Sequence, residues 1–294
     1  MLFPPQVLAN GLVIGCIYSL VAAGYALVYS TARFIHIAHG ATVVAGGFAA
    51  YYFMNTAGFG FFPAAAMALT LCMALGALME LLYYAPLRKR KATATMMFIG
   101  STGLFLLLIN ALILFFGGEG RMIMLPFGNP SFELLGAIFT LWQLVIIAAT
   151  IALMLLLMYF IRRSDWGLML RAVADQPALC AVNGIDVERI HLMVILISSL
   201  LAGVAGIMIG AEQSMRPESG IDLVLAGFTG AIMGGIGTIA GAALGAILLG
   251  MVQNMGAWFL PSTFKYAIGM TILAAFLVFR PQGIFGAKKE GSRA

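Results

Sequence analysis

Charged residues are scarce in this chain. Asp, Glu, Lys and Arg together make up 9% of its 294 residues, whereas hydrophobic residues make up 62%. A soluble domain carries about 25% charged residues, so this sequence cannot cover a water-exposed surface. The scarcity argues against a soluble enzyme or a nucleic-acid-binding protein. It predicts one integral membrane domain over residues 1–294, without a separate soluble module.

Cysteine is also rare. The three cysteines are Cys16, Cys72 and Cys180, of which two lie inside apolar runs and one in a loop. This spacing predicts neither a disulfide framework nor a metal site, and we expect these residues to act as small packing groups. The N-terminus lacks the basic stretch of a signal peptide, so the first apolar run is expected to be a retained span.

Several catalytic and nucleotide-binding motifs are missing from the sequence. It has no GxxxxGK[ST] phosphate loop, HExxH, CxxC or GxSxG, and the nearest look-alike, GGIGTIAG at 234–241, has no following Lys. The three histidines offer no metal-binding spacing. The sequence therefore predicts a protein that is not an enzyme, does not bind ATP by that route, and carries no cofactor or metal.

The middles of the apolar runs lack Asp, Glu, Lys and Arg. Glu80 and Lys265 lie near the ends of runs, where they are expected to snorkel to the membrane surface. Carriers driven by protons usually hold a carboxylate or a His at mid-membrane. A transporter of this composition is expected to take its energy from a partner ATPase, although backbone carbonyls alone can bind sodium.

What the chain does contain is a series of nine apolar runs. They cover residues 7–29, 38–54, 63–84, 95–116, 137–161, 190–211, 222–236, 238–258 and 264–279. The pattern predicts an all-α fold, a polytopic transmembrane helix bundle of about eight spans. Runs 38–54 and 222–236 are short and rich in Gly and Ala, which favours re-entrant or broken helices.

Basic residues divide unequally between the two ends of these runs. Cytoplasmic loops attract Lys and Arg. Placing the clusters at 88–91, 162–189 and 280–293 inside also places Arg33 inside, which gives 13 basic residues inside and leaves three outside, Arg121, Arg216 and Lys265. The N-terminus is then outside and the C-terminus cytoplasmic. This orientation requires an odd number of crossings, either nine or seven with two re-entrant pieces.

The cytoplasmic loop at about 162–190 is the only sizeable polar segment. Asp175 is expected to cap a short helix that has Pro177 in its first turn, and Asn183 and Gly184 are expected to end it. The apolar positions of this helix are Leu179 and Val182. Two interpretations remain open, an ordinary surface helix or a docking helix for a cytoplasmic partner.

Small and polar residues inside the apolar runs suggest further sites. Gly230 and Gly234 belong to a series with near small-xxx-small spacing, which predicts close helix packing or a substrate path lined by broken helices. His36, His39 and Gly40 lie where the second run begins. The histidines are expected to be interfacial hydrogen-bonding groups rather than catalysts, and all three residues are candidates for the substrate path. Polar side chains within the runs are expected to find partners across helices or to face a wet cavity. They include Asn110 and Gln253.

Four segments, in this order, resemble one known family. They are GLVIGCIYSLVAAGYALVYSTARFIHIAHGA at 11–41, YAPLRKRKATATMMFIGSTGLFLLLIN at 84–110, WGLMLRAVADQPALCAVNGIDVERI at 166–190, and GGIGTIAGAALGAILLGMVQ with FRPQGIFG at 279–286. The chain is similar over nearly its whole length to the integral-membrane permease of bacterial branched-chain amino acid ABC importers, the LivH-type subunit.

The resemblance implies a function and a set of partners. Asp175 to Gly184 resembles the coupling helix that seats in a groove of the ATPase subunit. A periplasmic binding protein would deliver the solute, and a second permease would complete the pathway. Two ATPase subunits would bind ATP and magnesium and drive alternating access. A multi-pass protein of the bacterial inner membrane is implied.

One departure from the family signature bears on the solute. The family often has Asn at the position of His36 and a polar residue at the position of Ala41, close to His39 and Gly40. Relatives move urea, short amides or sugars, so these remain alternatives to a branched-chain amino acid. A stand-alone secondary carrier or channel is the alternative of another class, and its distinguishing feature is that no ATPase subunits co-purify with it.

Overall fold

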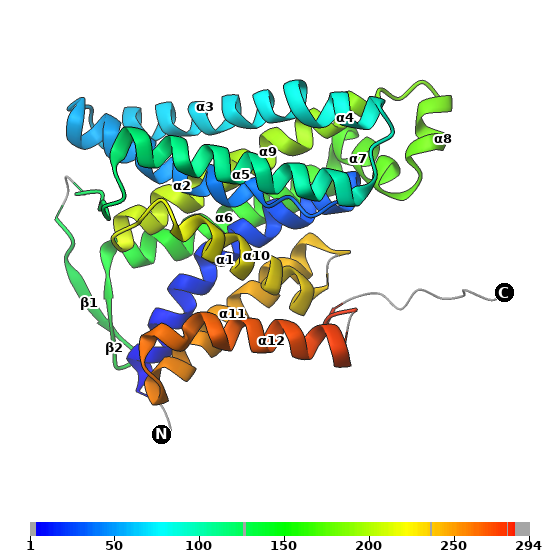
Figure 1. Ribbon diagram of the computed structural model, residues 1–294. Coiled ribbons are helices and arrows are strands. Elements are labelled where there is room, and N and C mark those ends of the chain that lie inside the picture. Colours follow the sequence, from blue (N-terminus) through cyan, green and yellow to red (C-terminus); the bar gives the residue numbers. More distant parts are fainter. Residues whose placement is uncertain (1–3, 126–127, 236, 281, 286–294) are drawn as a thin grey trace.

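The chain folds into a bundle of helices, as predicted (Figure 1). The computed structural model describes residues 4–125, 128–235, 237–280 and 282–285. The helices are α1 (Pro5–Ala32), α2 (Ala38–Tyr51), α3 (Phe61–Met79), α4 (Ala85–Lys89), α5 (Ala94–Phe116), α6 (Leu141–Arg163), α7 (Asp165–Asp175), α8 (Pro177–Val182), α9 (Val187–Glu212), α10 (Ser219–Gly234), α11 (Ile239–Phe259) and α12 (Lys265–Phe279).

Seven apolar helices in the described part of the chain are long enough to cross a bilayer. They are α1, α3 with α4, α5, α6, α9, α11, and α12 with the turn before it. Helices α2 and α10 are shorter, with 14 and 16 residues. At 1.5 Å per residue their α-helical parts reach about 21 and 24 Å, less than the hydrocarbon thickness of about 30 Å. Helix α2 continues directly into a π-helical stretch, Tyr52–Thr56. Helices α2 and α10 are the two Gly- and Ala-rich runs for which re-entrant or broken helices were expected.

A β-hairpin precedes α6 and corrects one predicted span. Strands β1 (Ser131–Leu134) and β2 (Ala137–Thr140) pair antiparallel around a turn in which Leu135 and Gly136 both have positive φ. The apolar run expected from residue 137 therefore becomes helical only at Leu141. The Thr140 hydroxyl accepts from the backbone N–H of Gln143, whose side chain accepts from the Thr140 N–H. This capping box fixes the helix start.

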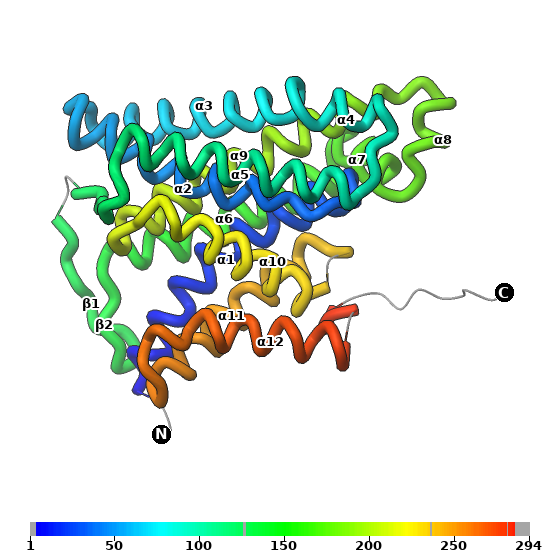
Figure 2. The backbone as a smooth tube through the Cα atoms, in the orientation of Figure 1, coloured from blue at the N-terminus to red at the C-terminus, as the bar shows by residue number. Residues whose placement is uncertain are grey.

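Six of the described helices form two groups of three, called halves here, with the same order of long, short and long; α5, α6 and α12 belong to neither. Helices α1, α2 and α3 form one half, and α9, α10 and α11 form the other (Figure 2). Each short helix packs on the first long helix of the opposite half. Gly46 of α2 lies against Gly203 of α9, and Gly227 of α10 lies against Val21 of α1. The two halves are therefore interlocked through α2 and α10.

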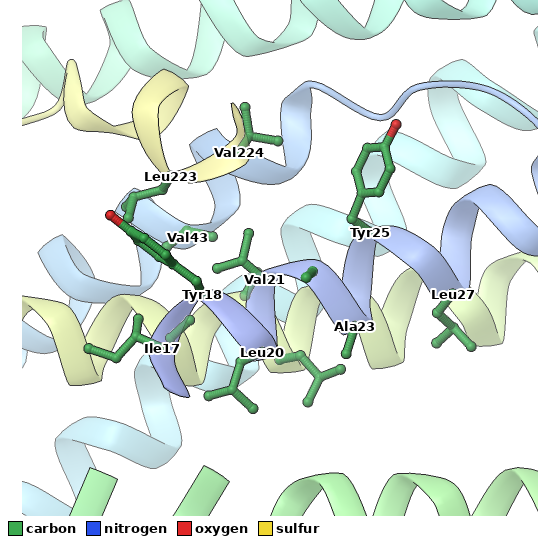
Figure 3. Packing of buried hydrophobic residues seen from close by; sticks show 14 of the residues in the cluster. Ile17, Tyr18, Leu20, Val21, Ala23, Tyr25, Leu27, Val43, Leu223 and Val224 are labelled. Atoms are coloured by element: carbon green, nitrogen blue, oxygen red, sulfur yellow. The ribbon is translucent and has the colours of Figure 1, made fainter. Parts of the chain in front are cut away.

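Burial separates central helices from peripheral ones. Each spanning helix has a most apolar stretch of 18 residues. The buried share of that stretch is 89% in α1 and 67% in α9, against 6% in α12 with the turn before it. Figure 3 shows Ile17, Tyr18, Leu20 and Val21 pointing from α1 in several directions. A helix that is apolar around its whole circumference belongs inside a bundle or a membrane. Helix α1 is therefore the axis on which the other helices pack.

The connections gather at two opposite ends of the bundle. The start of α1, the β-hairpin and the connection from α11 to α12 lie at one end (Figure 1). Helices α4, α7 and α8 lie at the other end, together with the end of α12. The basic residues of 88–91 and 162–163 belong to this second end. The arrangement agrees with the unequal distribution of charge along the sequence.

Candidate functional site

The polar segment between α6 and α9 contains two helices rather than one. Helix α7 was not expected from the sequence, although Ser164 gives the local signal, because its hydroxyl accepts from the Gly167 N–H at 3.0 Å. Leu170 and Val173 of α7 are buried against the bundle. Arg33, just after α1, donates to the Ala174 carbonyl at 2.6 Å. Helix α7 is thus fixed to the end of the central helix.

Helix α8 starts differently from the prediction. Asp175 is the last residue of α7 and does not cap α8, whose N-cap is Gln176 without a side-chain hydrogen bond. The reason is Pro177, because a proline excludes helical conformation at the residue before it. The expected end is confirmed. Asn183 follows the last helical residue and donates to the Leu179 carbonyl at 2.8 Å, and Gly184 has φ +82°.

Helix α8 presents its apolar side chains outward. Leu179 is 56% exposed and Val182 is 85% exposed, while Cys180 between them is buried. Figure 1 shows α8 projecting at the end of the bundle. Exposed apolar side chains on a projecting helix suit a contact with another protein.

A charged cluster connects the segment to α3. Arg88 donates to Glu188 in the first turn of α9 at 2.7 Å and also pairs with Glu80. Glu80 is only 1% exposed. The expectation that Glu80 snorkels to the membrane surface is therefore wrong. The helix that begins at Phe61 continues to Lys89 and keeps this residue inside the protein.

The two histidines at the start of α2 are buried and hydrogen-bonded. The His36 ring Nδ1 lies 3.0 Å from the Tyr84 hydroxyl and 3.3 Å from the Ser101 hydroxyl. The His39 ring bonds to the Ser198 hydroxyl and the Val21 carbonyl, each at 3.2 Å. The histidines therefore hold the non-helical segment 33–37 between α3, α5 and α9.

The predicted glycines lie at tight helix crossings. A Cβ atom on Gly40 would overlap the carbonyl oxygen of Gly220 in α10. A Cβ on Gly230 would lie 2.5 Å from the Ala246 Cα, and one on Gly234 would overlap the Gly241 carbonyl. Close packing of α10 on α2 and α11 is therefore the role that the structure gives these residues.

The two predicted amides behave differently from each other. Asn110 lies on the exposed side of α5 and donates to the Leu106 carbonyl of its own helix at 2.7 Å, rather than to a neighbouring helix. Gln253 is 3% exposed and lines a cleft between α10, α11 and α12. Asp222 and Tyr266 line the same cleft and were missed, because Asp222 stands at the edge of its run and Tyr266 gives no local signal.

Comparison with known proteins gives a consistent result. A family model described as "Branched-chain amino acid transport system / permease component" matches residues 7–279. The chain is 31% identical over 296 residues to the high-affinity branched-chain amino acid transport system permease protein BraD of Pseudomonas aeruginosa, covering 96% of this chain and 95% of BraD. It is 30% identical to LivH of Salmonella typhimurium over the same shares. The fructose import permease FrcC of Rhizobium meliloti is 30% identical over 43% of this chain and 36% of FrcC.

Proposed function

The chain belongs to the family of branched-chain amino acid transport system permease components, and from this premise we propose that it forms part of the translocation pathway of an ABC importer. It is a multi-pass membrane protein with helices long enough to cross the bilayer. In the proposed assembly it pairs with a second permease. Two ATPase subunits bind ATP and magnesium and drive transport, and a periplasmic binding protein delivers the solute.

A branched-chain amino acid is the proposed solute. The relatives that match 96% of this chain carry names of branched-chain amino acid permeases, whereas the fructose permease matches 43% of it. A zwitterion has no net charge, so helix ends and single polar side chains suffice to accompany it across the bilayer.

Coupling to the ATPase is assigned to the segment 162–190, and the exposed apolar pair of α8 is the observation that supports it. Leu179 and Val182 form the centre of the proposed contact. Asp175 and Asn183 are exposed at its edge, and Gly184 ends the helix. Arg33 connects α7 to the end of α1, and Arg88 connects α9 to the helix that follows α3. A displacement of α8 by the ATPase would therefore be transmitted to the central helices.

The face formed by α5, α10 and α12 is proposed to meet the pathway and the second permease. These three helices lie side by side, with α10 between the other two (Figure 2). Asn110 of α5 is exposed, and the cleft that holds Gln253 lies between α10, α11 and α12. His36, His39, Gly40, Gly230 and Gly234 support the helices behind this face. The exposed faces of α6 and of the continuous helix from Phe61 to Lys89 are mostly apolar and suit lipid, with Leu78, Leu81, Leu82, Ile151, Leu155 and Leu156.

The proposed orientation has the N-terminus outside and the C-terminus in the cytoplasm of a bacterial inner membrane. It is supported by the 13-to-3 distribution of basic residues. The ends of the bundle agree, since α8 and the hairpin lie at opposite ends (Figure 1).

Reconstitution of the complex tests the proposed function. The tagged permease is purified from its native membrane, the co-purifying subunits are identified, and the complex is placed in vesicles with its binding protein. We expect co-purified ATPase subunits and ATP-dependent uptake of leucine, isoleucine or valine in preference to urea, short amides or fructose. A stand-alone carrier would purify without ATPase subunits and would transport without ATP.

A further inference from the structure

The small cleft between α10, α11 and α12 has a composition unlike the rest of the membrane region. Its polar lining residues are Asp222, Thr229, Gln253 and Tyr266. The volume of the cleft is about 30 Å³, more than the roughly 10–15 Å³ that a cavity needs to hold one water molecule. Tyr266 is 48% exposed, so the cleft opens at the surface of the chain. It can hold a small polar headgroup but not a whole amino acid.

A carboxylate without a cationic partner dominates this cleft. Tyr266 lines the cleft beside Asp222, and the two side chains interact. Asp222 makes no ion pair with any of residues 4–125, 128–235, 237–280 and 282–285. The nearest basic residue along the chain from Tyr266 is Lys265, and its ammonium group donates to the Asn254 side chain at 3.0 Å instead. The negative charge of Asp222 is thus available to a ligand.

Gln253 gives a second, independent indication of a ligand. Only 3% of the residue is exposed, and its side chain lines the cleft without a hydrogen-bond partner among the described residues. The amide is not among the fully buried polar atoms, so it is reachable from the cleft and its oxygen can accept a hydrogen bond there. A Cβ atom on Gly269 of α12 would lie 2.6 Å from the Gln253 Nε2. The glycine therefore leaves room for the amide at the edge of the cleft.

We propose that Asp222, Tyr266 and Gln253 form a binding site for the α-ammonium group of the transported amino acid. The proposal rests on the proposed function and adds the chemical group that the site recognises. An ammonium group is the size of the cleft, carries the opposite charge to Asp222, and donates three hydrogen bonds. The oxygen atoms of Asp222, Tyr266 and Gln253 are three acceptors. The aliphatic side chain of the solute then lies outside the cleft.

A pair of ligands tests the site directly. L-leucine and 4-methylpentanoate share a carboxylate and an aliphatic chain, and only leucine has the ammonium group. Binding of each to the purified complex in nanodiscs, without binding protein, is measured by saturation-transfer NMR, which detects weak ligands. Asp222→Asn keeps an oxygen acceptor for Tyr266 but removes the charge. Glu218→Gln, an exposed residue before the first turn of α10, removes a charge outside the cleft.

We expect leucine to bind the wild-type complex and 4-methylpentanoate to bind at least about tenfold more weakly. Asp222→Asn should weaken leucine binding by about 10- to 100-fold, the usual range for a lost charge-assisted hydrogen bond. It should leave 4-methylpentanoate unchanged. Asp222→Glu should restore part of the loss, and Glu218→Gln should behave as wild type.

Several results would overturn the proposal. They are unchanged leucine binding in Asp222→Asn, an equal loss of both ligands, no leucine binding to the wild-type complex, or leucine binding that requires sodium. Equal loss would indicate a structural role, and a sodium requirement would indicate a metal cation in the cleft. A separate result would refute the proposed transport function itself. In that case the wild-type complex in vesicles would take up no branched-chain amino acid.

Discussion

Gly40 of α2 and Gly220 of α10 face each other so closely that a Cβ atom on Gly40 would overlap the Gly220 carbonyl oxygen. The two residues begin the two short helices, and they belong to opposite halves of the chain. Backbone contact of this kind is possible only where neither residue has a side chain in the way. The crossing therefore joins the two halves directly through their backbones.

Gly40→Ala is expected to destabilise the permease. The added methyl group must separate α2 from α10, and overpacking of this kind costs about 1–3 kcal/mol. Gly103→Ala is the matched control, because Gly103 is also inside a helix and has no atom within 4 Å of its Cβ position. The measurement is the melting temperature of the purified protein. Equal melting temperatures for both variants would show that the crossing tolerates a side chain.

Arg88→Gln should also lower stability strongly. It leaves Glu80, which is 1% exposed, without its ion-pair partner. Removal of one partner of a buried pair costs about 3–5 kcal/mol. Thermal denaturation of the purified protein reports the loss, and the double variant Glu80→Gln, Arg88→Gln should recover part of it. Lys89→Gln, at an exposed neighbouring position, should have little effect. If the Arg88→Gln and Lys89→Gln variants have the same melting temperature, the ion pair between Glu80 and Arg88 does not stabilise the protein as described.

The double variant Leu179→Asp, Val182→Asp should uncouple the permease from its ATPase. Both side chains are exposed, so the permease itself should fold normally. At the proposed contact two uncompensated carboxylates would be buried, at a cost of several kcal/mol. Pull-down of ATPase subunits and ATP-dependent leucine uptake should both fall, while the loaded binding protein should still dock. Normal association together with normal uptake would refute the coupling role of α8.

Single cysteines in a Cys-free background should report the proposed orientation. Replacements at Lys89 and Arg163 should resist a membrane-impermeant thiol reagent added to intact cells, because both lie at the proposed cytoplasmic end. Replacements at Arg121 and Glu133, which are exposed at the opposite end, should react. Labelling of a cysteine at position 89 or 163 from outside would show that the proposed orientation is wrong.

Much of the helix pattern follows from local features of the sequence. Each apolar run becomes a helix because a bilayer leaves backbone N–H and C=O groups no partner except one another. The short Gly- and Ala-rich runs were recognisable by length and composition. The end of α8 was recognisable as well, since Gly184 adopts its positive φ without a steric penalty. Such signals act over a few residues and require no knowledge of the fold.

Other features depended on partners far along the chain. Glu80 is adjacent to a run's end in sequence, but Arg88 and the continuing helix keep it buried. The cleft unites Asp222 of α10 with Tyr266 of α12, and nothing near either residue indicates the other. Hydropathy specifies that a helix lies in the membrane but not which of its faces meets a neighbour, because lipid and helix are equally apolar. Only close packing between small residues decides which helices touch, and so only the tertiary structure brought these polar groups together.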